Sequence, residues 1–335
     1  MRWYLKHGLV VDKIYEVVQY TPQKCFEPFA EKVSENRLKG MLENKSILAQ
    51  TFKLLGNSAY GKTLENKGKH TKVLYVDAKE HDRCVCDPLF KKSTPLNDEG
   101  TLFEVEMSLD KIIWDLPMQI GFFVYQYAKL RMLEFYYDFI DRFISREDFE
   151  LAEMDTDSLY MGISANSLED LIKPGKREAF YQEFSKYLQA ESCENHRQAF
   201  VDTRVQGGEW QRAQCCEDAN SKSRFTPGLF KVEHTADVIT ALCSKTYITY
   251  SKQPDNGEVD VKLSCKGLNK YTNNLTGEIY SKVLANRQAA GGVNRGFKVR
   301  ADGVFQYEQY RKALSFLYIK RKVLDDGIST EPLDI

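Results

Sequence analysis

Residues 149–163 read Phe-Glu-Leu-Ala-Glu-Met-Asp-Thr-Asp-Ser-Leu-Tyr-Met-Gly-Ile. Two apolar runs flank Asp155-Thr-Asp157-Ser158, and short polar side chains of this kind favour a tight turn. The stretch therefore predicts a β-hairpin with two carboxylates at its tip. One could then hold a divalent metal while the other supports the turn, although a plain Asp-rich turn has the same sequence.

The segments around this hairpin mix helices and strands. Pro117 begins a predicted long helix with one apolar face, formed by Phe123, Tyr127, Leu130, Leu133, Tyr137, Ile140 and Ile144 at spacings of three and four. Upstream, the residue types predict a strand pair over 8–20, helix over 26–63, and short strands with turns over 66–110. Downstream they predict a polar helical insertion over 167–200, a loop over 201–228, two strands over 229–250, and a helix over 304–320. No regular βαβ alternation appears, so the fold class is predicted to be α+β.

Length and composition exclude several classes of protein. The chain has 335 residues, of which 42% are hydrophobic and 28% charged, values typical of a globular protein with two or three domains. No apolar run approaches the roughly 18 residues that a membrane span needs, so no membrane partner is expected. Residues 1–7 contain no apolar signal core, so we expect an intracellular protein.

Charge is distributed unevenly along the chain. The formal net charge is -1, yet residues 262–322 contain 13 basic residues against three acidic ones. A block of this kind could follow an anionic backbone such as that of a nucleic acid, or could be a solvated surface.

The eight cysteines and five histidines give no metal-site pattern. No Cys-x-x-Cys pair occurs, and the close pairs Cys84/Cys86 and Cys215/Cys216 have poor spacing for zinc. We therefore expect reduced cysteines with structural roles and no histidine cluster.

The stretch from Gly56 to Thr63 has two interpretations. It matches the P-loop pattern GxxxxGK[ST], which requires a strand before it and a helix after it. The residues before it look helical, however, and a turn follows soon after Thr63. In the second interpretation residues 47–63 form one helix, on which Lys53, Asn57 and Tyr60 share a face beside Gly61. That face offers a cation, an amide and an aromatic ring, the groups that a nucleoside triphosphate needs, although it could also be a polar solvent-exposed face.

These motifs occur in an order that resembles family B DNA polymerases of the protein-primed type, found in some phages, linear plasmids and self-synthesising transposons. The fingers helix of that family carries KxxxNSxYG, which matches residues 53–61. Its metal-binding palm hairpin carries DTDS, which matches residues 155–158, and a later KxY motif matches Lys245-Thr-Tyr247. Residues 262–267, Lys-Leu-Ser-Cys-Lys-Gly, look like the lysine and glycine element on the thumb side.

The resemblance implies a function for each matched residue. It implies DNA-directed nucleotidyl transfer, with a two-metal Mg²⁺ site that contains Asp157 and, in a weaker supporting role, Asp155. Lys53 would act in catalysis by neutralising the triphosphate, and the dNTP site would comprise Lys53, Asn57, Ser58, Tyr60 and Gly61. The DNA-binding residues would be Lys245, Tyr247, Lys262 and Lys266. The implied partners are a DNA template with a primer or a priming terminal protein, and dNTPs.

One departure from the family is expected to limit activity. Family members carry a further acidic motif, DxxSLYPS, before the fingers, and the 335 residues contain no such motif. The exonuclease domain of the family is also absent. We therefore expect a C-terminal palm, fingers and thumb portion that is weak or inactive alone, and that would need an N-terminal polymerase segment as a partner. The alternatives are a P-loop NTPase and a non-catalytic nucleic-acid-binding remnant.

The same resemblance implies a division into five parts. Residues 1–25 would form part of the palm and 26–66 the fingers helices. An inserted hairpin subdomain would occupy 67–112. Residues 113–250 would complete an antiparallel palm with long helices, and 251–335 would form a small basic thumb.

Overall fold

The computed structural model describes residues 1–19, 21, 23–24, 26–97, 99–224, 226–252, 259–300, 303–315, 321–325 and 330–332. The chain divides into two compact units, Met1–Val124 and Tyr125–Ile335. Helices are mixed with small antiparallel sheets of two or three strands, as the α+β prediction requires. No helix among the described residues is long and apolar enough to cross a membrane.

Helices dominate the first half of unit 1. After α1 (Arg2–Lys6), helices α2 (Glu27–Leu42) and α3 (Ser46–Thr63) pack against each other. The chain reverses between them at Asn44, which has a left-handed φ of 55°. Buried Gly40 allows the close approach, because a Cβ there would lie 2.8 Å from the backbone nitrogen of Ala49. The predicted helical stretch over 26–63 is therefore two helices.

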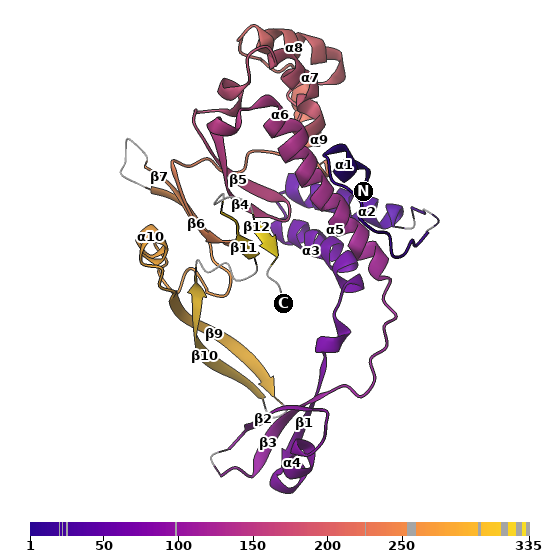
Figure 1. Cartoon of the computed structure of the whole chain (residues 1–335), viewed down its shortest axis with the longest axis vertical. Coiled ribbons are helices and arrows are strands. Elements are labelled where there is room, and N and C mark those ends of the chain that lie inside the picture. Colours follow the sequence, from indigo (N-terminus) through magenta and orange to yellow (C-terminus); the bar gives the residue numbers. More distant parts are fainter. Residues whose placement is uncertain are drawn as a thin grey trace. The chain divides into compact units, whose positions relative to one another are not determined.

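A small sheet forms the rest of unit 1. A 3-10 turn, η1 (Lys67–Lys69), precedes β1 (Thr71–Asp77), α4 (Ala78–Val85), β2 (Phe90–Pro95) and β3 (Leu102–Ser108). The strands pair in the order β1-β3-β2, with α4 beside them (Figure 1). Their core contains Val76, Val105 and Met107. The short strands predicted over 66–110 are present, and α4 was not predicted.

An aromatic core organises the first part of unit 2. Helix α5 (Met118–Leu133) continues into a π-helical segment, η2 (Glu134–Ile140), and α6 (Asp141–Phe143). The long helix predicted after Pro117 is thus confirmed, but Phe123, Tyr127 and Tyr137 of its predicted apolar face are exposed. After η3 (Arg146–Asp148) come β4 (Phe149–Asp155) and β5 (Ser158–Ile163), which form the predicted hairpin. The next helical segments are η4 (Leu168–Leu171), α7 (Arg177–Tyr187), η5 (Glu194–His196), α8 (Arg197–Val205) and α9 (Gln214–Ser223). Their shared core is made of Phe135, Phe139, Ile140, Phe143, Ile144, Phe149, Phe180, Tyr181, Tyr187, Phe200 and Val201.

A second sheet follows in unit 2. It consists of β6 (Val238–Cys243), β7 (Thr246–Lys252) and β8 (Val259–Ser264), and α10 (Gly277–Asn286) packs on it. Its core contains Leu242, Ile248, Tyr280, Val283 and Leu314. Strands β9 (Ala290–Arg300) and β10 (Gly303–Leu314) form a long ribbon (Figure 1), and β11 (Arg321–Val323) pairs with β12 (Thr330–Pro332).

Three predictions of secondary structure were wrong. Residues 8–19 form no strand, because none of the described strands pairs with them and their side chains are exposed. The loop predicted over 201–228 contains the end of α8 and all of α9. Instead of the helix predicted over 304–320, the chain forms strand β10 as far as Leu314, because it pairs with β9. Residues 316–320 lie outside the described part of the chain. The two strands predicted over 229–250 are present as β6 and β7.

Candidate functional site

The turn between β4 and β5 presents the two predicted carboxylates. Asp155 pairs with Ser158, and the Asp157 backbone N–H donates to the Asp155 carbonyl at 2.5 Å. Thr156 takes a left-handed φ of 49°, which is rare for a β-branched residue. Asp155 is half-buried and Asp157 is exposed. Within the described part of the chain, the Asp157 carboxylate has no hydrogen bond or ion pair, so it remains open to a ligand.

The turn between β6 and β7 brings the predicted Lys-x-Tyr motif to this hairpin. Lys245 Nζ lies 3.0 Å from Asp155 Oδ1. The hydrogen bond and charge of Asp155 raise the pKa of Lys245, with a further contribution from the Asp157 charge. Two backbone contacts fix this turn, because the Lys245 N–H donates to Glu153 Oε1 at 3.0 Å and its carbonyl accepts from Ser264 Oγ at 2.9 Å.

An aromatic pair extends the contact between the two hairpins. The hydroxyls of Tyr160 and Tyr247 are 2.8 Å apart and their ring centroids 4.6 Å apart. Lys262 Nζ lies 5.3 Å from the Tyr160 ring centroid. Burial raises the pKa of Tyr247, and the hydrogen bond with Tyr160 adds to the shift. Asp155, Lys245, Tyr247 and Lys262 therefore lie in one connected cluster, whereas Lys266 is exposed beyond the end of β8.

Glu153 belongs to this cluster but was not predicted. Its side chain is only 6% exposed, and Oε2 has no hydrogen-bond partner among the described residues. The pairing of β4 with β5 shifts register between Leu151 and Glu153. Such a bulge re-aims a side chain, and nothing in the alternation of the sequence reveals it. The sequence does not distinguish it from Glu150, an acidic residue of the same strand that is exposed.

A polar groove lies next to Lys262. Its volume is about 440 Å³, and it is lined by Gln189, Asn220, Ser221, Arg224, Lys231, Val232, Glu233 and Lys262. Lys231 is paired with Glu233 at 3.2 Å. The cationic side chains make the groove suitable for an anionic ligand such as a phosphate chain.

The predicted nucleotide residues of unit 1 all lie on helix α3. Residues 56–63 lie inside this continuous helix, so they do not form the loop that a P-loop requires. Lys53 and Asn57 are exposed and Tyr60 is half-buried. At 100° per residue these three share one side of the helix.

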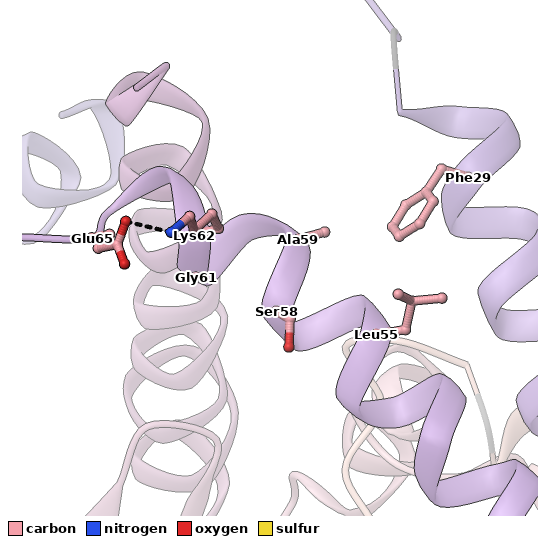
Figure 2. A pocket seen from close by; sticks show the side chains of 7 residues that line it. All are labelled: Phe29, Leu55, Ser58, Ala59, Gly61, Lys62 and Glu65. Atoms are coloured by element: carbon pink, nitrogen blue, oxygen red, sulfur yellow. Dashed lines mark hydrogen bonds and ion pairs between the residues drawn. The ribbon is translucent and has the colours of Figure 1, made fainter. Parts of the chain in front are cut away.

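Ser58 and Gly61 line a shallow groove along α3, and Lys53, Asn57 and Tyr60 are not among its lining residues. The groove has a volume of about 700 Å³ and is also lined by Phe29, Leu55, Ala59, Lys62 and Glu65. Figure 2 shows Phe29 of α2 facing Leu55 of α3, and Lys62 paired with Glu65 at 2.5 Å. The five predicted residues thus do not line a single groove.

A cluster of three cysteines and one histidine was not predicted, because the spacing of these residues in the sequence gave no metal-site pattern. The ligand atoms of Cys193, His196, Cys215 and Cys216 all lie within 4.8 Å of one another. The hydrogen bond with His196 lowers the pKa of Cys193 to about 6, and the neighbouring Cys193 sulfur raises the pKa of Cys215. The spacing rule used on the sequence missed the cluster because its two halves are separated by helix α8.

Comparisons of the chain with protein-family models, with curated proteins and with solved structures found no match.

Proposed function

We propose that this chain is the palm, fingers and thumb portion of a protein-primed family B DNA polymerase. The observation that carries the proposal is the 3.0 Å contact between Lys245 of the Lys-x-Tyr motif and Asp155 of the DTDS motif. These two motifs are about 90 residues apart in the sequence. Their convergence in unit 2 supports a common site.

The residues of the turn between β4 and β5 fit a divalent cation. Mg²⁺ takes one or two carboxylates and completes its shell with water and substrate phosphates. Asp157 supplies an exposed carboxylate and Asp155 a second one beside it, which Lys245 holds in place. When bound, Mg²⁺ would assist ionisation of the attacking hydroxyl and stabilise the pyrophosphate leaving group.

The lysines near this turn would hold the primer and template. Lys245 and Lys262 belong to the same cluster, and Lys262 also lines the groove with Arg224 and Lys231. Tyr247 would support the primer end through its hydrogen bond with Tyr160. On helix α3, the exposed Lys53 and Asn57, with Tyr60, would receive the incoming dNTP.

The lack of a second acidic motif limits the activity proposed for this chain. A loss of 4 kcal/mol of transition-state stabilisation slows a reaction about a thousandfold. We therefore expect the 335 residues alone to bind primer–template DNA but to extend primers little or not at all.

DNA binding tests the proposal directly. Fluorescence anisotropy with a labelled primer–template at low salt should show binding that Lys245→Ala and Lys262→Ala each weaken several-fold. Lys79→Ala, which removes a lysine on the exposed helix α4 of unit 1, is the charge-matched control and should bind like the unmodified chain. Failure to bind DNA at low salt would refute the proposal. Mg²⁺-dependent dNTP incorporation that Asp157→Asn abolishes would refute only the expectation of low activity.

A further inference from the structure

Two short segments of unit 2 bring four soft ligands together. Cys193 precedes the turn η5 and His196 ends it, three positions later, so both side chains lie on one side of the turn. Cys215 and Cys216 occupy the first turn of α9. The intervening chain includes α8 and returns so that the second pair meets the first.

Four of the six distances between the ligand atoms are close to the edges of a tetrahedron around a metal ion. Cys193 Sγ lies 3.1 Å from His196 Nδ1, 3.6 Å from Cys215 Sγ and 3.9 Å from Cys216 Sγ. Cys215 Sγ lies 3.4 Å from His196 Nδ1. With Zn–S bonds of about 2.3 Å and Zn–N bonds of about 2.0 Å, tetrahedral geometry places ligand atoms roughly 3.4–3.8 Å apart.

We propose that Cys193, His196, Cys215 and Cys216 form a structural zinc site. Three thiolates and one imidazole make a Cys₃His set, in which all four positions of tetrahedral Zn²⁺ are filled by protein. A filled set leaves no position for a substrate or water, so the site is structural rather than catalytic. Binding releases the thiol protons to solvent, and the ion is neither oxidised nor reduced.

The surrounding contacts show what the zinc would stabilise. Asn220 Nδ2 of α9 donates to the Ala190 carbonyl at 2.8 Å, and the Ala190 N–H donates to Ser223 Oγ at 3.0 Å. Gln189 Nε2 donates to Asn220 Oδ1 at 2.9 Å. These bonds join α9 to residues 189–190, a few residues before Cys193, so the metal would reinforce a junction that is already hydrogen-bonded.

This junction forms one wall of the polar groove next to Lys262. Gln189, Asn220, Ser221 and Arg224 line the groove, and they come from the same two segments that supply the four ligands. Zinc would therefore hold the groove in shape from the other end of α9. The metal site itself depends only on the ligand geometry, and it would stand even if the groove bound no nucleic acid.

Metal analysis tests the site. The full chain, purified with a reductant and without chelator, should contain about one zinc ion per molecule by inductively coupled plasma mass spectrometry. His196→Ala and Cys215→Ser change partly exposed ligands and should remove most of the zinc. Cys86→Ser changes an exposed cysteine of unit 1 and should retain it.

A second measurement uses the unmodified chain, because changing a ligand next to the fully buried Cys216 could also disturb folding. Cobalt added to the metal-free, unmodified chain should give the absorption bands of tetrahedral thiolate coordination, and zinc should displace them. Absence of these bands and of zinc from a chain with a folded circular dichroism spectrum would overturn the proposal. A disulfide between any two of the three cysteines, detected by intact mass after purification under reductant, would also overturn it.

Discussion

At the scale of single residues, Glu153 connects the two motif-bearing hairpins. Its Oε1 accepts the backbone N–H of Lys245, a residue held at a left-handed φ of 67°. Removing the acceptor leaves this part-buried donor unsatisfied, and leaving a buried donor unsatisfied costs about 1–3 kcal/mol, so that range is an upper bound here. We expect Glu153→Ala to lower the free energy of unfolding by at most this amount in urea denaturation.

Glu153→Gln tests whether the stability comes from this hydrogen bond or from the space that the side chain fills. The glutamine carbonyl can still accept the Lys245 N–H, so the loss of stability should be clearly smaller than in Glu153→Ala. The glutamine variant should also keep most of the affinity for primer–template DNA, because Lys245 stays in position. Equal losses of stability in the two variants would show that the hydrogen bond with Lys245 contributes little.

Tyr247 gives a prediction for alkaline pH. Its pKa is raised in the folded chain, by burial and by the hydrogen bond with Tyr160, above the value of about 10 for an unfolded tyrosine. Above about pH 10 the unfolded chain loses this proton while the folded chain keeps it, so stability should fall as the pH rises. Below that pH the residue adds no pH dependence.

Unfolding measured between pH 8 and 11 should show this loss. Tyr247→Phe should make the decline less steep, and buried Tyr280, whose pKa is also raised by burial, accounts for a remaining part. Tyr271→Phe at a ring that is 81% exposed is the control and should behave like the unmodified chain. An unchanged slope in Tyr247→Phe would contradict the assignment.

At the scale of elements, the sequence was informative where local pattern and tertiary packing agree. The helix after Pro117 and the hairpin over 149–163 have strong apolar signals, and both are present. Strand β10 was mistaken for a helix, and it is the pairing with β9 that decides its structure. The bulge at Glu153 and the convergence of Cys193 with Cys215 depend on tertiary structure, which residue spacing does not encode.

Helix α3 gives a prediction that separates its two interpretations. Lys53 is exposed and has no ion pair within the described residues, whereas Lys62, on the opposite side of the helix, pairs with Glu65. If the Lys53 side receives the triphosphate, Lys53→Ala should reduce photo-crosslinking of an azido-dNTP to the DNA-bound chain about tenfold. A loss of that size equals about 1.4 kcal/mol of binding free energy.

Lys62→Ala is the matched control for this helix. It removes the lysine of the GxxxxGK[ST] pattern, which a P-loop would need for the phosphates. We expect this variant to crosslink nearly as well as the unmodified chain. The reverse result, with loss in Lys62→Ala alone, would favour a P-loop NTPase and should then be accompanied by ATP hydrolysis.

At the scale of the whole molecule, a near-neutral net charge conceals a strongly basic C-terminal segment. Residues 262–322 carry a formal charge of +10, and the remaining residues therefore carry -11. Lysines that contact phosphates release condensed counterions, so the logarithm of the binding constant falls linearly with that of the salt concentration. Binding of duplex DNA should therefore weaken steeply with salt, although the isoelectric point of about 6.6 predicts no general affinity for polyanions.

The slope of that salt dependence can be assigned to particular residues. Each lysine that contacts a phosphate contributes a slope of about one, so Lys262→Ala should lower the slope by roughly that amount. Lys79→Ala should leave it unchanged, because α4 lies outside the basic segment. Anisotropy titrations from 50 to 200 mM salt, a range of about fourfold, would measure both. Equal slopes in the two variants would mean that DNA binding does not depend on a specific contact with Lys262.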